Sequence, residues 1–312
     1  MILKLAMIFP GQGKQNIHRI IQLNKYNSII YHTFQEASEY LNYNIWDIIK
    51  IPLITYQTTY AQPIILTMSV ALYRLWKSIG GINPIISAGH SLGEYSALVC
   101  SNAMTFSDGI KIVQKRAIMM KKQINGLSIQ MQAIIGLKKK IILKLCKNHL
   151  FDHMVNIANI NSDNQIVISG HKKAVQNISI ICKKMGAKTI ILPIDVAAHC
   201  NIMKKIRRKF VKHIKKIHIQ KTQYPVINSI SVKQQISQHT IRKSLVKQLF
   251  KPVQWSKTMK VITSISNIIL EMGTGNVLTK LNNNNYINII PMYTIKNIYK
   301  IINLLSKNNY DK

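Results

Sequence analysis

The chain has 312 residues, of which 47% are hydrophobic, enough for one large α/β domain or two of ordinary size with a sizeable core. Its 43 Lys and Arg residues against 10 Asp and Glu give a formal charge of +33, which favours anionic partners, although A/T-rich codons would produce the same enrichment in Lys, Ile, Asn and Tyr. No apolar run reaches the ~18 residues of a membrane span, and no zinc-finger or RNA-recognition motif accompanies the charge, so the sequence argues against a membrane protein and against specific nucleic-acid binding.

The first apolar run, Met1–Phe9, predicts a buried strand. Pro10 cuts this run short and no cleavage pattern follows, which argues against a signal peptide. The turn Pro10-Gly11-Gln12-Gly13 fits neither a phosphate loop nor a dinucleotide fingerprint, but it presents backbone N–H groups. The N–H of Gln12 is therefore a candidate oxyanion donor if the turn lies beside a nucleophile, and a plain exit from the strand is the alternative.

Residues 17–50 alternate polar and apolar side chains at helical spacing, and Gln57–Ile79 predicts a long helix with one apolar face. Gly80-Gly81 and Pro84 end that helix and lead into the next apolar run. Helices that alternate with short buried strands indicate a parallel sheet that is covered on both faces.

The run Ile85–Gly89 leads into Gly89-x-Ser91-x-Gly93 and then into a small-residue helical pattern. This order of strand, sharp turn and helix is typical of a nucleophile elbow. Side chains in place of the two glycines would collide with the crossing strand and helix, and Ser91 would take a strained backbone conformation. Ser91 is therefore a candidate nucleophile, and the N–H of Leu92 is free to face an oxyanion. The alternative is an ordinary glycine-rich turn with a chance serine.

Thr105–Asp108 is typical of a helix cap, and Gly109–Gln123 predicts the helix that follows. This helix carries Arg116 next to apolar residues, in a chain whose cations are mostly Lys. A planar guanidinium can hold a carboxylate in two hydrogen bonds. Arg116 is thus a candidate anion-binding residue, although its local surroundings favour a solvated helix cation.

From Gly126 to Pro193 the pattern changes to short β-rich runs separated by two helical patterns. The order β-α-β-β-α-β predicts a small ferredoxin-like subdomain. We therefore predict an α/β chain in which an α/β-hydrolase-like core with a parallel sheet, residues 1–125 and 195–312, carries an inserted ferredoxin-like α+β subdomain, residues 126–194. The β-rich runs are Ile129–Leu137, Met154–Asn161, Gln165–Gly170 and Lys188–Leu192, and the helical patterns are Lys138–Leu150 and Lys172–Met185.

His199 follows a β-rich run at the point where the core resumes, and its neighbours are small. It is a candidate base for Ser91, although a lone histidine is more often structural. Asp195 is the only acid that could serve as the third member of a triad. A backbone carbonyl can orient the base instead and fixes its tautomer without a buried negative charge, so both options stay open.

Lys247–Trp255 predicts the end of a helix followed by an extended segment, and Ile268–Leu278 predicts a further strand, turn and helix. The Lys- and Asn-rich tail from Lys296 is expected to be frayed. The cysteines lack the spacing of a metal site, so no metal is implied, and reduced thiols in a cytoplasm are favoured. They are Cys100, Cys146, Cys182 and Cys200.

Taken in order, these motifs resemble those of the malonyl-CoA:acyl carrier protein transacylases, within the acyl transferase family. Each motif alone is weak, but the ordered set spans nearly the whole chain and is specific. The matching segments are Phe9–Gly13, Gln62-Pro63, Gly89–Leu98, Arg116, Asn161-Ser162, His199-Cys200, Pro252–Trp255 and Glu271-x-Gly273-x-Gly275.

The resemblance implies that Ser91 is the acylated nucleophile and His199 its base, with the main-chain carbonyl near Gln248 orienting His199. It implies a ping-pong transfer of the malonyl group from malonyl-CoA to the phosphopantetheine thiol of acyl carrier protein, in fatty acid synthesis. The chain would then be an acyltransferase with no cofactor of its own. Its implied partners are malonyl-CoA and an acidic acyl carrier protein, and it is expected to be a cytoplasmic monomer.

The same resemblance implies the binding groups. The N–H groups of Gln12 and Leu92 would form the oxyanion hole, and Arg116 would hold the malonyl carboxylate. The other substrate-binding residues that it implies are Gln62, His90 and Met120.

The chain also departs from the family pattern, without losing a chemical group that the mechanism needs. The departures are Lys14, Asp195, Ala197-Ala198 and Thr274. Two other functions stay open: a serine thioesterase or esterase would share the elbow and pass the acyl group to water, and a polyanion-binding protein built on a decayed enzyme would use only the charge.

Overall fold

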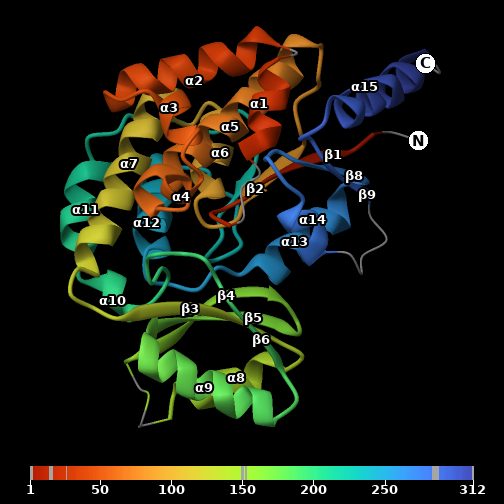
Figure 1. Ribbon diagram of the computed structural model, residues 1–312. Coiled ribbons are helices and arrows are strands. Elements are labelled where there is room, and N and C mark those ends of the chain that lie inside the picture. Colours follow the sequence, from red (N-terminus) through yellow and green to blue (C-terminus); the bar gives the residue numbers. More distant parts are fainter. Residues whose placement is uncertain are drawn as a thin grey trace.

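A five-stranded parallel sheet, sheet A, organises the larger part of the chain (Figure 1). The computed structural model describes residues 3–13, 17–25, 27–148, 151, 153–282 and 288–310. Every pairing in sheet A is parallel, and the strand order is β7-β2-β1-β8-β9. The strands are β1 Leu5–Phe9, β2 Ile86–Gly89, β7 Val226–Ile227, β8 Ile268–Glu271 and β9 Asn288–Pro291.

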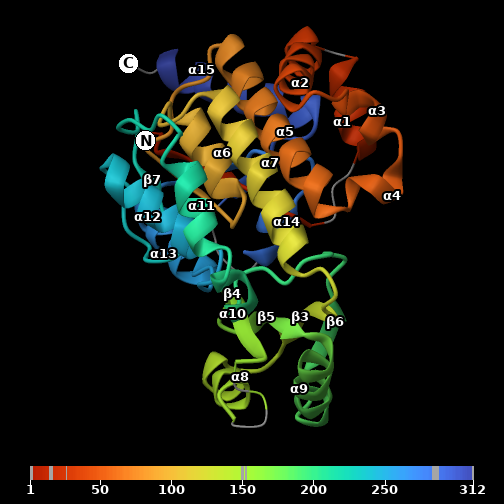
Figure 2. The same cartoon turned by 90° about the vertical axis from the view of Figure 1, so that its left-hand side faces the viewer.

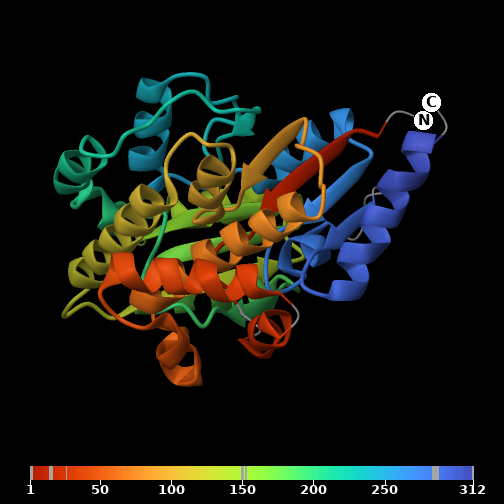
Figure 3. The same cartoon turned by 90° about the horizontal axis from the view of Figure 1, so that it is seen from above.

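Helices cover both faces of sheet A, and alternate residues of β1 accordingly pack into two different cores. Leu5, Met7 and Phe9 pack into the main core, whereas Ala6 and Ile8 pack with residues of α13 and α14 on the opposite face. Figure 3 shows the strands lying between these groups of helices. The helices of this part are α1 Ile17–Asn24, α2 Ser28–Leu41, α3 Ile45–Ile49, α4 Pro52–Thr55, α5 Thr58–Ser78, α6 Gly93–Cys100, α7 Phe106–Gln123, α10 Asn201–Lys204, α11 Arg207–Ile214, α12 Gln238–Gln248, α13 Trp255–Ile265, α14 Val277–Leu281 and α15 Ile295–Tyr310.

A second, antiparallel sheet, sheet B, lies beneath the first as a separate lobe (Figure 2). Its order is β4-β5-β3-β6, with every pairing antiparallel, and its apolar face packs on α8 and α9 to form a core of its own. The prediction of an α/β chain with a parallel sheet and a separate ferredoxin-like unit is confirmed, while the exact limits 126 and 194 stay a prediction. The elements are β3 Ile129–Ile135, α8 Lys139–Cys146, β4 Val155–Ser162, β5 Gln165–His171, α9 Lys172–Lys184 and β6 Lys188–Ile191.

The two lobes are joined by main-chain hydrogen bonds at Val253. Ile160 N–H donates to the Val253 oxygen at 2.8 Å, and Val253 N–H donates to the Ala158 oxygen at 2.9 Å. Val253 therefore adds to the edge of β4 just before α13 begins, and α13 packs against β4. This junction holds the inserted lobe beside the C-terminal ends of the parallel strands.

The expected fraying of the tail from Lys296 is wrong for the described residues of this tail, and residues 311–312 lie outside them. Helix α15 forms there, and Ile298 and Ile301 are buried against the core. The expectation rested on the Lys- and Asn-rich composition of the tail and overlooked these two apolar residues, which lie three positions apart on one face of the helix. Within the part of the chain that the structure describes, no helix is long and apolar enough to cross a membrane, and the four cysteines are free and buried.

Candidate active site

The turn between β2 and α6 has the backbone geometry of a nucleophile elbow. Ser91 has φ of +52°, a left-handed conformation that is rare for a residue with a side chain. A Cβ atom on Gly89 would lie 1.9 Å from the Gly93 carbonyl carbon, and one on Gly93 would lie 2.0 Å from the Phe9 oxygen. The predicted reason for both glycines, collision with the crossing helix and strand, is therefore confirmed.

His199 meets Ser91 although 108 positions separate them in the sequence. Its Nε2 lies 2.7 Å from the Ser91 Oγ, and its Nδ1 lies 2.7 Å from the main-chain oxygen of Gln248. A carbonyl oxygen can only accept, so Nδ1 carries the proton and Nε2 is left to accept the proton of the Ser91 hydroxyl. His199 also has a left-handed backbone, with φ of +60°, which its N–H stabilises by donating to the Leu249 oxygen at 3.0 Å.

Asp195 does not take the place of a triad acid. Its carboxylate contacts Thr58 and Lys121, whereas the Nδ1 of His199 faces the Gln248 carbonyl. Of the two options that the sequence left open, the geometry matches the one with a backbone carbonyl. The histidine is thereby oriented without a second buried charge.

Two backbone N–H groups are available beside the serine. Among the described residues, no hydrogen bond uses the N–H of Gln12 or of Leu92. Both residues line the same pocket as Ser91, one from the turn after β1 and the other from the start of α6. Two unpaired donors next to a nucleophile are what a developing oxyanion requires.

Arg116 is a buried cation whose hydrogen bonds all go to neutral groups. Its side chain reaches from α7 into the pocket, and the residue is 1% exposed. Nη1 donates to Gln62 Oε1 at 2.7 Å, while Nη2 donates to Gln248 Oε1 at 3.3 Å and reaches the Ser91 Oγ at 3.5 Å. No ion pair among the described residues includes it. The expectation that its surroundings make it a solvated cation is wrong.

The pocket that these groups share brings together the side chains that the sequence analysis singled out. It encloses about 400 Å³, its open mouth included. The predicted residues that line it are Gln12, Gln62, His90, Ser91, Leu92, Arg116, Met120 and His199, and the further lining residues are Met131, Asn159, Ile194, Val196 and Ala198.

Comparison with known proteins places this chain in a family. The family model described as "Acyl transferase domain" matches residues 6–295. The chain belongs to the acyl transferase family. The resemblance that the motifs predicted is confirmed.

Relatives within the acyl transferase family match the chain over nearly its full length. The malonyl CoA-acyl carrier protein transacylase of Buchnera aphidicola subsp. Schizaphis graminum is 41% identical over 298 residues, 94% of this chain and 96% of its own. The solved malonyl CoA-acyl carrier protein transacylase of Coxiella burnetii is 36% identical, with a TM-score of 0.93 over 96% of this chain and 97% of its own. A solved complex of a type II PKS acyl-carrier protein with its malonyl-transacylase is 35% identical, with a TM-score of 0.91 over 95% of this chain and 98% of that chain.

Within this acyl transferase site, Gln248 has the main-chain role that the resemblance implied, and its side chain makes further contacts that the sequence did not reveal. Its main-chain oxygen holds His199, and its Oε1 accepts from Arg116. Its Nε2 donates to the main-chain oxygen of Ser91 at 2.9 Å and to Glu94 Oε2 at 2.7 Å. One residue thus joins the nucleophile and the buried cation through its side chain and the base through its main chain.

Glu94 anchors Gln248 from the first turn of α6. It is fully buried and accepts hydrogen bonds from Gln248, from the N–H and hydroxyl of Ser229, from Gln235 and from Ser244. Uncharged donors therefore satisfy the carboxylate. Sequence spacing gave no signal for this cluster, because its members come from three distant segments.

His90 supports the elbow from its other side. Its Nε2 lies 3.0 Å from Asn161 Oδ1 on β4, and its ring packs edge-on against Trp255. Burial lowers the pKa of His90, which favours the neutral ring. His90 therefore joins the elbow to the inserted lobe, and its ring also borders the pocket.

Burial also lowers the pKa values of the base, His199, and of the cation, Arg116. It lowers the pKa of His199 to about 3, with the nearby Arg116 charge as the second cause. The ring is therefore neutral at physiological pH and ready to accept a proton. Burial lowers the pKa of Arg116 as well, but a guanidinium stays protonated, so the pocket retains a positive charge.

Several lining residues escaped the sequence analysis. Met131 and Asn159 come from the inserted lobe, and their periodic apolar strands gave no sign that these positions face a site. Ile194, Val196 and Ala198 flank His199 and could have been found from that proximity. Of the departures from the family pattern, Lys14 lies outside the described residues. No group of three or more His, Cys, Asp or Glu side chains in the described part of the chain could hold a metal ion.

Proposed function

We propose that this protein transfers the malonyl group of malonyl-CoA to the phosphopantetheine thiol of acyl carrier protein through an ester on Ser91. The elbow, the paired histidine and the two free N–H groups supply the acyl-transfer chemistry. The observation that carries the choice of a malonyl group is Arg116, a buried guanidinium whose hydrogen-bond partners are all neutral.

In the first half-reaction, His199 Nε2 takes the hydroxyl proton as the Ser91 Oγ attacks the thioester carbon. The N–H groups of Gln12 and Leu92 stabilise the oxyanion that forms; removing one such donor typically costs on the order of 10²–10³ in rate. The carbon–sulfur bond then breaks, and the imidazolium returns the proton to the departing coenzyme A thiol. Malonyl-Ser91 remains.

In the second half-reaction, the thiol of the carrier protein's arm gives its proton to the Nε2 of His199 and attacks the ester carbon. The carbon–oxygen bond breaks, and the Ser91 oxygen recovers a proton from the imidazolium. The same base and oxyanion donors serve both steps, so the kinetics are ping-pong. Each atom that moves belongs to one of the two substrates or to this pair of side chains, so the reaction as written needs no resident cofactor or metal.

Arg116 selects the length of the acyl group as well as the charge of that group. Its Nη2 lies only 3.5 Å from the Ser91 Oγ, so the carboxylate that it holds must follow closely on the ester carbonyl. A malonyl group places one methylene between the two. A charge-assisted pair formed in a water-poor pocket also offsets the desolvation of the guanidinium.

The finer parts of the proposal concern partners and setting. An acidic carrier protein suits a chain with a formal charge of +33, because opposite charge speeds encounter. A related complex of an acyl-carrier protein with its malonyl-transacylase supports this class of partner. We propose a monomer, since one chain supplies every pocket residue, and a cytoplasmic setting, in keeping with free cysteines. We further propose that neither a specific nucleic acid nor a membrane is a partner.

The experiment that tests this function follows the fate of the malonyl group. The protein is mixed with malonyl-CoA, with and without acyl carrier protein that bears its phosphopantetheine arm, and malonyl-carrier and free malonate are measured. We expect malonyl-carrier to form rapidly and malonate slowly. Fast release of malonate that the carrier protein does not suppress would identify a thioesterase instead.

A further inference from the structure

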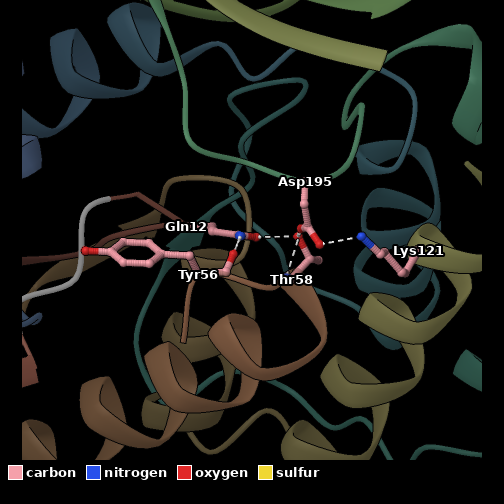
Figure 4. A network of polar contacts seen from close by, with 5 residues as sticks. All are labelled: Gln12, Tyr56, Thr58, Lys121 and Asp195. Carbon is pink, nitrogen blue, oxygen red and sulfur yellow. Dashed lines mark hydrogen bonds and ion pairs between the residues drawn. The ribbon is translucent and has the colours of Figure 1, made fainter. Parts of the chain in front are cut away.

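Asp195 stands at the junction between the inserted lobe and the catalytic core, four residues before His199. It is the only acid between Asp163 and Glu271 in the sequence, a stretch otherwise rich in Lys and Arg. Its neighbours Ile194 and Val196 line the pocket, whereas its own side chain does not. The carboxylate points instead to the first residue of α5 and to the last turn of α7 (Figure 4).

Asp195 binds the first turn of α5. Its Oδ1 accepts from the Thr58 hydroxyl at 2.5 Å and from the Thr58 N–H at 2.9 Å. The N-cap residue of α5, Gln57, makes no side-chain cap hydrogen bond, so a carboxylate from 137 positions away takes that role. The positive end of the helix adds to the attraction.

Lys121 fixes the other oxygen of the same carboxylate. Its Nζ lies 2.7 Å from Asp195 Oδ2, five residues beyond Arg116 on α7. The side chains of this pair are 46% and 29% exposed, so solvent weakens the pair but does not remove its geometric effect. Burial acts to raise the pKa of Asp195, but the hydrogen bonds from Lys121 and Thr58 and the charge of Lys121 together outweigh it and lower the pKa below its usual value. The carboxylate is therefore ionised at neutral pH.

The short segment that Asp195 holds, residues 56–58, in turn holds the side chain of Gln12. Gln12 Nε2 donates to the Tyr56 oxygen at 3.2 Å, and Gln12 Oε1 lies 3.2 Å from the Thr58 hydroxyl. The segment thus contacts both ends of the amide, at Nε2 through the hydrogen bond to the Tyr56 oxygen and at Oε1 through the nearby Thr58 hydroxyl (Figure 4). The hydroxyl has one proton and two acceptors, and the charged, nearer carboxylate takes the larger share of it.

We propose that Asp195, acting through Thr58, is a positioning residue for the oxyanion hole. This inference rests on the proposed function, because it concerns the N–H of Gln12 in that reaction. The carboxylate fixes the 56–58 segment, the segment fixes the Gln12 amide, and the amide fixes the direction of the Gln12 N–H. The same anchor ties the chain that leads to His199 to α5 and α7, so the base and the oxyanion donor share one support.

The test measures the rate at which the Ser91 ester forms from malonyl-CoA, by rapid quench and mass spectrometry. Thr58→Val removes the hydroxyl at nearly constant shape, and Asp195→Ala removes the carboxylate. We expect each to lower the maximal acylation rate about tenfold while the KM for malonyl-CoA changes less than about twofold, because a displaced donor weakens the transition state only. Thr58→Ser keeps the hydroxyl and should retain most of the rate.

Glu36→Gln is the matched control. The Arg74–Glu36 pair has side chains 37% and 30% exposed, close to those of Lys121 and Asp195, and it joins α2 to α5 away from the pocket. This variant should lower the melting temperature and leave acylation unchanged. A purely structural role for Asp195 would give the same pattern in Asp195→Ala.

Each outcome decides one question. Wild-type acylation rates in Thr58→Val or Asp195→Ala, or equal losses in Thr58→Ser and Thr58→Val, would overturn the proposal. If Asp195→Ala does not fold by circular dichroism, Asp195→Asn replaces it, because its amide oxygen still accepts from the Thr58 N–H; a slower rate at unchanged KM would then support the proposal and an unchanged rate would overturn it. Absence of a Ser91 ester in the wild type would instead contradict the proposed function.

Discussion

Glu94 lies 2.7 Å from the Nε2 of Gln248, the residue whose main-chain oxygen accepts the Nδ1 proton of His199. The carboxylate is fully buried, three residues after the nucleophile. Glu94 therefore positions His199 indirectly: its carboxylate binds the side chain of Gln248, and the main-chain oxygen of Gln248 binds the histidine. In many triads the acid contacts the histidine directly.

Glu94→Gln should weaken both the fold and the catalyst. The new amide turns one acceptor into a donor that faces donors, so we expect the free energy of unfolding to fall by about 1–3 kcal/mol. We also expect a lower acylation rate, since Gln248 loses its anchor. Urea unfolding and the rate of Ser91 ester formation check this. A variant with normal stability and a normal rate would show that Glu94 does not hold Gln248.

Arg116→Ala should separate malonyl from acetyl substrates. The loss of charge-assisted hydrogen bonds to the malonyl carboxylate should lower kcat/KM for malonyl-CoA by about 100-fold, roughly 3 kcal/mol. Acetyl-CoA has no carboxylate, so its kcat/KM should stay the same or rise. Arg116→Lys, which keeps the charge but not the planar fork, should fall between them for malonyl-CoA. Equal losses for both thioesters would contradict the assignment of the clamp.

The pH profile of acylation should lack an acid limb near the ordinary pKa of histidine. Burial and the Arg116 charge lower the pKa of His199 to about 3, so the neutral base persists as the pH falls from 8 to 5. The same shift makes the free energy of unfolding depend on pH, because His199 takes up a proton near pH 6.5 in the unfolded chain but not in the folded protein. Its contribution to stability is therefore complete above about pH 6.5 and declines toward pH 3.

Two measurements check this. The kcat/KM for acylation should be flat between pH 5 and 8. In Arg116→Met, assayed with acetyl-CoA, loss of the neighbouring charge should raise the pKa of His199 and move the acid limb upward. A wild-type limb centred near pH 6.5 would show that the ring of His199 is not held neutral by its surroundings.

Gly93→Ala should be far more damaging than Gly275→Ala. The added Cβ on Gly93 would meet the main-chain oxygen of Phe9 at 2.0 Å, and neither backbone can move without displacing the elbow. On Gly275 the nearest atom would lie 4.0 Å away, at the Val277 side chain. We expect a loss of roughly 3 kcal/mol or more and inactivity for the first, and less than about 1 kcal/mol for the second, by thermal unfolding. Comparable losses would show that the elbow tolerates a side chain.

The sequence predicted the local parts of this site well. The elbow around Ser91 can be predicted from a few consecutive residues, because the close approach of crossing backbones requires glycine at positions 89 and 93. The separate antiparallel lobe followed from the order of its short apolar runs. Arg116 shows the limit of such reasoning, since its surroundings alone suggested a solvated cation and only the resemblance assigned it a ligand.

What the sequence could not predict are the polar contacts between distant segments. Nothing near Gln248 signals that its side chain joins Ser91, Glu94 and Arg116. Likewise, the sequence position of Asp195 suggests that it contacts His199, but its carboxylate binds Thr58 and Lys121. Such contacts depend on how strands and helices are placed in space, and a pattern of residue types along the chain does not record that placement.

The most direct test of the whole account is the mass of the intact protein after brief exposure to malonyl-CoA, with the modified peptide sequenced. The account predicts one added malonyl group, located on Ser91, in the wild type and none in Ser91→Ala. A malonyl group on another residue, or equal labelling of Ser91→Ala, would contradict it.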